Sequence, residues 1–139
     1  MKLLVEYPTK QELGQIVTLT EAFNVEPAKP VVTPEGLLSM RQMIQQIPIA
    51  DAVLERALDL VMKTHADNKY IREGASPRAA QFIVRCAKAR ALMLGRLNVS
   101  FEDINAVAPD VLRHRIILSF DAVADGVDSD AVISKILAE

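Results

Sequence analysis

Arg78 is the residue whose position is least explained by folding alone. Ser76 and Pro77 precede it and open a predicted helix, so Arg78 stands in the first helical turn. The helix dipole disfavours a cation there by about 0.3–1 kcal/mol, while the free backbone amides of the same turn favour an anion. Two interpretations follow: Arg78 binds a phosphate or carboxylate group, or it forms a salt bridge with a nearby acid such as Glu73.

A second group of candidate residues, Arg113, His114 and Arg115, follows a short predicted helix. The dipole favours cations near a helix C-terminus, which makes a structural role the simpler interpretation and a binding role the alternative.

Cys86 lies within another predicted helix, and its only possible catalytic partners are two lone histidines. We therefore interpret it as a small buried thiol.

The basic residues of the longest predicted helix and of the turn after it are interpreted mainly as solvated surface. They are Lys88, Arg90 and Arg96, of which Arg90 alone falls near the apolar stripe of the helix. We expect Arg96 to lie on a solvated stretch.

The sequence contains no motif that would bind a nucleotide or a metal without help. It has neither a G-x-x-x-x-G-K-[ST] loop nor a G-x-G-x-x-G turn, so no phosphate-binding loop of its own is present. One cysteine and two separated histidines do not form a zinc motif. The acidic stretch 121–130 fails as a calcium loop, because Val123 and Val132 would occupy ligand positions.

Length and charge exclude several classes of protein. The chain has 139 residues, which suits one domain, and its formal net charge of −2 gives no electrostatic reason to bind nucleic acid or an anionic membrane. A single cysteine fits a reducing compartment, and no apolar run approaches the roughly 20 residues that span a bilayer. We therefore expect a cytoplasmic protein with neither nucleic acid nor membrane as a partner.

The elements that must position these residues are amphipathic helices, and six or so capped segments with short connections predict an all-α bundle. Lys2 to Tyr7, ending at Pro8, is the only strand-like segment, an extended arm or a single strand. The predicted helices run from Thr9 to about Ala22, from Thr33 to Ile47 after a linker over 24–34, from Asp51 to about His65, from Ser76 to Gly95, from Ser100 with a break or restart at Pro109, and from Asp128 onward. The stripes expected to face the core include Leu37, Met40, Ile44 and Ile47, and then Val53, Leu54, Ala57, Leu58, Val61 and Met62.

Four segments of the sequence closely resemble the C-terminal part of the MoxR-type AAA+ ATPases. They are Gly74-Ala75-Ser76-Pro77-Arg78-Ala79, Ala87-Lys88-Ala89-Arg90-Ala91, Val99-Ser100-Phe101-Glu102-Asp103-Ile104 and, above all, Ala108-Pro109-Asp110-Val111-Leu112-Arg113-His114-Arg115-Ile116. Val5-Glu6-Tyr7-Pro8 is similar to the last core strand of the family, although Glu6 stands where a small residue is more common. His65 and Leu97-Asn98 also depart from the family pattern.

The resemblance implies that residues 1–8 are an extended stub from the end of an α/β core. Residues 9–139 would then be the helical AAA+ lid domain. In this family the Arg of G-A-S-P-R is the sensor-2 residue that reaches the γ-phosphate of ATP, and it maps onto Arg78, with Ser76 and Pro77 opening its helix. The cluster of Arg113, His114 and Arg115 would contact the core or a neighbouring subunit.

The resemblance also implies a longer parent protein that binds ATP and Mg²⁺ and forms a hexameric ring. That parent would act as a chaperone in the maturation of other protein complexes, in some cases with a von Willebrand factor A-domain partner. Because the Walker A and B motifs and the arginine finger would precede Met1, this chain alone should neither hydrolyse ATP nor hold it tightly.

Two alternatives to a nucleotide role remain open. Residues 100–115 could form a DNA-binding helix-turn-helix with a basic end, although the net charge of −2 weighs against it. The chain could also be a protein-interaction domain with no nucleotide role.

Overall fold

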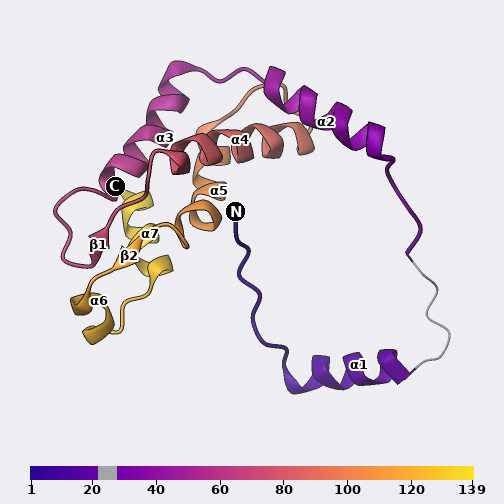
Figure 1. The fold of residues 1–139 in the computed structure, drawn as a ribbon, viewed down its shortest axis with the longest axis horizontal. Coiled ribbons are helices and arrows are strands. Elements are labelled where there is room, and N and C mark those ends of the chain that lie inside the picture. The colour runs from indigo at the N-terminus through magenta and orange to yellow at the C-terminus, as the bar shows by residue number, and fades with distance from the viewer. Residues whose placement is uncertain (22–27) are drawn as a thin grey trace.

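A computed structural model describes residues 1–21 and 28–139, and the fold in this part of the chain is mostly helical, as predicted (Figure 1). The described elements are α1 (Lys10–Glu21), α2 (Pro34–Gln46), α3 (Asp51–Lys63), β1 (Ile71–Glu73), α4 (Arg78–Met93), α5 (Phe101–Leu112), β2 (Ile117–Leu118), α6 (Phe120–Ala124) and α7 (Ser129–Ala138). The predicted end of the first helix at Ala22 and the start of the linker at 24–27 lie outside the described residues.

The helix starts that the sequence predicts are present. The Thr9 hydroxyl accepts a hydrogen bond from the Glu12 amide at 3.3 Å, and the Glu12 carboxylate accepts one from the Thr9 amide at 2.8 Å. This reciprocal pair is a capping box, and it satisfies two amides that α1 itself cannot pair. The side chains of Thr33 and Asp128 cap α2 and α7 by accepting from backbone amides.

The buried core lies between α3, α4, α5 and α7, and its largest fully buried apolar side chains are Leu60, Ile83, Ile104, Leu112 and Ile133. The stripe predicted for α3 is only partly correct. Leu58 and Met62 are 39% and 66% exposed, whereas Leu60 is buried in their place. Leu54, Leu58 and Met62 recur every four residues and form a separate face of α3, on which Leu54 is half-buried and the other two are exposed.

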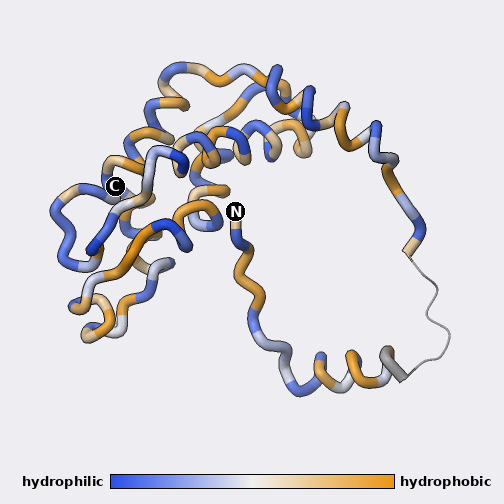
Figure 2. The backbone as a smooth tube through the Cα atoms, in the orientation of Figure 1, coloured by the Kyte–Doolittle hydropathy of each residue, from blue (hydrophilic) through white to orange (hydrophobic). Residues whose placement is uncertain are grey.

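α1 and α2 also carry exposed apolar side chains. Figure 2 shows hydrophobic positions along both helices, and α1 lies apart from the bundle in the same view. Leu13 of α1 and Leu37 and Met40 of α2 are exposed, whereas Ile47, at the end of the predicted stripe of α2, is buried. No helix within the described residues is long and apolar enough to cross a membrane.

The prediction that Lys2 to Tyr7 is the only strand-like segment is wrong. These residues form no strand, because a single strand without a partner leaves its backbone groups unpaired. Only Lys2 is fixed to the bundle, through its amide, which donates to the Asp110 carbonyl at 2.8 Å, and its carbonyl, which accepts from Arg113 at 3.1 Å. The strands of the described chain are β1 and β2, an antiparallel pair too short for a hydropathy pattern to reveal.

The predicted break at Pro109 is also wrong, because α5 continues through it to Leu112. Proline fixes a backbone angle that suits a helix, although it lacks an N–H and its ring crowds the carbonyl four residues earlier. The helix continues past it, and the Arg113 amide donates to the Pro109 carbonyl at 2.9 Å. Residues 100–115 of the described chain therefore contain one helix and not two. This excludes the helix-turn-helix interpretation of that segment.

The carboxylate of Asp103 joins the end of α4 to the start of α5. Asp103 is completely buried, and its oxygens accept hydrogen bonds from Arg96 at 2.8 Å and 2.5 Å, from Arg90 at 2.5 Å, and from the Ser100 amide at 2.9 Å. These donors, Arg96 first among them, hold the pKa of the Asp103 carboxyl well below its usual range. The same bonds complete the capping box of α5.

The expectation that Arg96 lies on a solvated stretch is therefore wrong. Gly95 has a φ of +71°, and this left-handed turn reverses the chain so that Arg96 returns over the first turn of α5. Helical spacing does not predict this contact, because Arg96 lies beyond the end of α4.

We expect Asp103→Asn to lower the free energy of unfolding by about 3 kcal/mol. The substitution leaves two guanidinium groups without their shared carboxylate, and removing one partner of a buried pair is strongly destabilising. Urea denaturation checks this, with Glu102→Gln as the control. Glu102 is the exposed neighbour, and its substitution should change stability by no more than about 0.5 kcal/mol.

The same carboxylate predicts the sensitivity of the fold to acid. Because its pKa is lower in the folded than in the unfolded state, its stabilisation is complete above about pH 4 and is lost as the pH falls toward the folded pKa. The unfolding free energy of the natural chain should therefore fall more steeply between about pH 4 and pH 2 than that of Asp103→Asn. Parallel curves in urea titrations across this range would show that Asp103 does not set the acid limit.

Candidate functional site

Arg78 is the first residue of α4, and its side chain is exposed. Within the described residues its guanidinium makes no hydrogen bond or ion pair. Glu73, the predicted partner in the salt-bridge interpretation, instead lies 3.6 Å from Arg72. The structure therefore leaves the cation of Arg78 available to a group outside the described chain.

The start of α4 favours an anion. Pro77 occupies the N-cap position, and no side chain caps the helix there. α3 also lacks a side-chain cap, whereas α2, α5, α6 and α7 have one. Ser76 is exposed, and its carbonyl accepts from the Ala79 amide at 2.8 Å. The positive end of the helix dipole and an unpaired guanidinium thus meet at one place, an arrangement that suits a phosphate or carboxylate.

Two residues at the end of α3 hold the segment that leads to Arg78. The buried Thr64 hydroxyl accepts from the Ala75 amide at 2.9 Å and donates to the Val61 carbonyl at 2.6 Å. Nε2 of His65 lies 2.8 Å from the Ala75 carbonyl oxygen, which can only accept, so this nitrogen carries the proton. Both backbone groups of Ala75 are therefore fixed to α3, three residues before the helix that carries Arg78.

Gly74 allows this close contact. A Cβ atom at position 74 would lie 2.6 Å from the Thr64 carbonyl oxygen and 2.7 Å from Nδ1 of His65. A contact to backbone at that distance cannot be relieved by rotating a side chain. Glycine is required here by space and not by a left-handed backbone angle.

The cluster after α5 does not act as one unit. Arg113 is fully engaged, with its side chain 2.8 Å from Asp130 and 2.9 Å from Asp110, which favours the structural interpretation for this residue. His114 and Arg115 are half-buried, and their Nδ1 and Nε atoms have no hydrogen-bond partner within the described chain. Burial and the neighbouring Arg115 cation lower the pKa of His114, which favours the neutral ring.

Arg115 is brought to the helix that carries the candidate site. Its guanidinium lies 4.9 Å from the centre of the Phe82 ring. Phe82 comes four residues after Arg78, so the two share a face of α4. This contact could not be predicted, because helical spacing does not indicate which face of α4 the segment after α5 will meet.

The remaining candidate groups do not form a site. Within the described residues no group of three His, Cys, Asp or Glu side chains could hold a metal ion. Asp125, from the acidic stretch, pairs with Lys69 at 2.7 Å. Cys86 is half-buried on α4, and burial raises the pKa of its thiol.

The comparisons with known proteins identify the class of this helical bundle. The family model described as "AAA lid domain" matches residues 63–136, more than half of the chain, and the chain belongs to this family.

Its relatives include MoxR proteins, as the resemblance predicted. The chain is 31% identical over 146 aligned positions to "Chaperone MoxR1" of Mycobacterium tuberculosis, an alignment that covers 98% of this chain and 38% of the relative. It is 45% identical over 53 positions to "Protein MoxR" of Methylorubrum extorquens, across 38% of this chain and 16% of that protein. A solved structure of a candidate ATPase from Cytophaga hutchinsonii superposes with a TM-score of 0.85 at 32% identity, over 96% of this chain and 43% of its own. The chain therefore spans less than half the length of these relatives.

We expect Gly74→Ala to destabilise the bundle by about 1–3 kcal/mol, because the added methyl group forces the Ala75 contact with Thr64 and His65 open. Thermal and urea denaturation check this. Gly14→Ala in α1 is the matched control: the added Cβ meets nothing within 4 Å there, and alanine is the better helix former. Equal stability of the two variants would mean that the contact with α3 does not hold the segment.

Proposed function

We propose that this chain is the lid of a longer MoxR-type ATPase, in which it closes over ATP and Arg78 acts as the sensor-2 residue. The observation that carries the proposal is the unpaired, exposed guanidinium of Arg78 at the uncapped start of α4. Residues 1–8 are the stub that joins the lid to the α/β core, and residues 9–139 are the lid.

The residues at the start of α4 fit a terminal phosphate group. Arg78 offers a planar pair of donors, which matches the oxygens of a phosphate, and the positive helix end adds to the attraction. In this proposal ATP and Mg²⁺ would be bound by the core of the longer protein, as the family resemblance implies. Arg78 would stabilise the charge that develops on the γ-phosphate as hydrolysis proceeds.

The packing of the bundle suits a part that moves as one body. The Thr64 and His65 contacts join α3 to the start of α4, Asp103 joins α4 to α5, and Arg113 joins α5 to α7. A displacement of Arg78 therefore carries the other helices with it. In a hexameric ring this would report the nucleotide state to the neighbouring subunit, through surfaces that include His114 and Arg115.

The relatives suggest the larger role. One is named a chaperone, and we infer that the longer protein uses ATP hydrolysis to mature or remodel other protein complexes in the cytoplasm. A von Willebrand factor A-domain protein is the partner that the family resemblance suggests.

In the longer protein, Arg78→Ala should slow ATP turnover by on the order of 10- to 100-fold, because the lost guanidinium acts mainly in the transition state. The same change should alter the stability of the 139-residue chain by no more than about 0.5 kcal/mol, since the side chain is exposed and unpaired. Arg78→Lys should restore only part of the activity, because a point charge does not reproduce the planar fork. Steady-state phosphate release measures all three.

Arg72→Ala is the matched control for this experiment. Arg72 is an exposed arginine on β1 whose ion pair to Glu73 lies at the surface, and its loss should leave turnover unchanged. Strong destabilisation of the Arg78→Ala chain together with normal turnover of the longer protein would contradict the sensor role and make Arg78 a structural residue.

The 139-residue chain by itself should show no ATP turnover and only weak ATP binding, because it lacks a phosphate-binding loop. Phosphate release and calorimetric titration of a preparation of proven purity check this. Turnover that disappears when residues of this chain are changed would contradict the proposal and require an ATP site within the lid. A longer protein that does not bind ATP would instead favour the interaction-domain alternative.

A further inference from the structure

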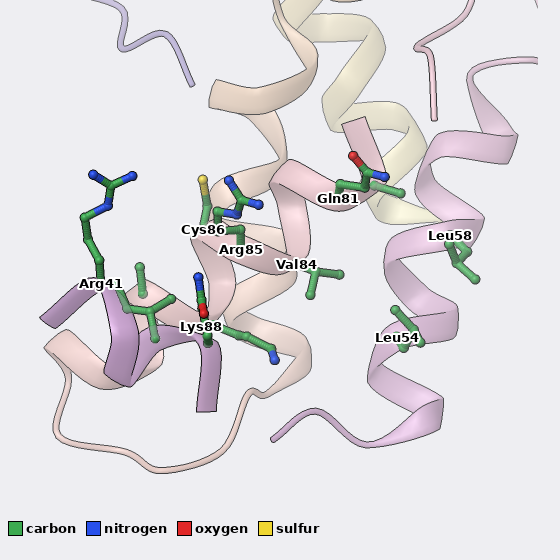
Figure 3. Close-up of a pocket in the computed structure, with 12 residues that line it drawn as sticks. Arg41, Leu54, Leu58, Gln81, Val84, Arg85, Cys86 and Lys88 are labelled. Atoms are coloured by element: carbon green, nitrogen blue, oxygen red, sulfur yellow. The ribbon is translucent and has the colours of Figure 1, made fainter. Parts of the chain in front are cut away.

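A groove of about 720 Å³ lies between α2, α3 and α4 (Figure 3). Its apolar lining includes Leu54 and Leu58 of α3 and Val84 of α4. Leu54 is half-buried and Leu58 is exposed. The groove is therefore an apolar surface that the described chain leaves partly open.

Every charged side chain that lines this α2–α4 groove is a cation. α2 contributes Arg41, and α4 contributes Arg85 and Lys88, as Figure 3 shows, whereas no Asp or Glu lines it. Within the described part of the chain none of the three forms an ion pair, and Arg85 has only the Phe82 ring at 5.8 Å. Because the whole chain carries a net charge of −2, this positive charge is a local feature.

The shape of the groove fits a helix better than a compact ligand. α4 lines it from Ala80 to Ala89, and at 1.5 Å per residue this is a length of about 14 Å, or two and a half helical turns. Apolar side chains at positions i, i+3 or i+4, and i+7 of a docked helix span a similar distance. The small side chains of Ala80 and Ala89 allow such a helix to approach closely.

We infer that the α2–α4 groove is a docking site for an acidic amphipathic helix of a partner protein. Apolar side chains of that helix enter the groove between α3 and α4. Its acidic residues pair with Arg41 on α2 and with Arg85 and Lys88 on α4. The inference is independent of the nucleotide role of Arg78.

Cys86 supplies the reporter for a test. It lines the groove and is the only cysteine in the chain, so the rate at which a maleimide dye labels it reports whether the groove is covered. The probe is a synthetic helix-forming peptide with leucines at i, i+3 and i+7 and glutamates on both flanks. The comparison peptide has lysines in place of the glutamates. The acidic peptide should slow labelling in a saturable manner, and the basic peptide should not.

Charge reversal in the groove should change which of the two peptides it binds more tightly. Arg85→Glu combined with Lys88→Glu should raise the Kd of the acidic peptide about tenfold or more and should admit the basic peptide. Arg41→Glu, on a different helix, should also raise the Kd of the acidic peptide. This variant provides the test if the double variant does not fold. Arg72→Glu, outside the groove, should leave both Kd values unchanged.

Three results would overturn the inference. Equal protection of Cys86 by both peptides would show that the groove binds apolar side chains without regard to charge. No protection by either would show that the groove takes no helix. Labelling that slows as the chain alone is concentrated, with a matching rise in mass by light scattering, would show that a second copy covers the groove.

Discussion

The buried ion cluster around Asp103 is the interaction on which the positions of the other elements depend. One carboxylate, fully buried, accepts hydrogen bonds from Arg90 in the last turn of α4, from Arg96 just beyond that helix, and from the Ser100 amide at the start of α5. A charge in such a place is tolerated only when every lone pair finds a donor, so the geometry of all its partners is set together. The cluster joins the end of α4 to the start of α5. α3 and α7 then pack against this pair to complete the core.

The opposite end of α4 is fixed by a neutral contact. Thr64 and His65 hold both backbone groups of Ala75, and the absence of a side chain at Gly74 lets the two segments meet. With both ends fixed, α4 has little freedom of its own. Arg78 therefore lies at a fixed helix start, where its guanidinium has no partner within the described residues.

The local features of this structure could be predicted from the sequence, and the long-range ones could not. Thr9, Thr33, Ser100 and Asp128 start helices because capping depends on residues within one turn, and the place of Arg78 follows from Ser76-Pro77 in the same way. The continuation of α5 through Pro109 depended on packing around it. The contacts of Arg96, Thr64 and Arg115 join residues whose proximity is decided by how helices pack, and β1 and β2 form only because that packing brings them together. Hydropathy identified apolar positions on α3 but not which of its faces the core would cover.

Because α4 is long, a small rotation about one of its ends produces a larger displacement at the other end. The helix has 16 residues and is about 24 Å long, so it acts as a lever between the Arg78 end and the Asp103 end. Both ends of α4 are fixed to the other helices, so a tilt of about 10° about the Arg78 end would carry the bundle with it and displace the opposite end by about 4 Å, roughly the diameter of a methyl group. The α2–α4 groove, whose wall includes Ala80 and Ala89, would move with the bundle. A rigid lid would thus turn a small displacement at Arg78 into a movement large enough for another protein to detect.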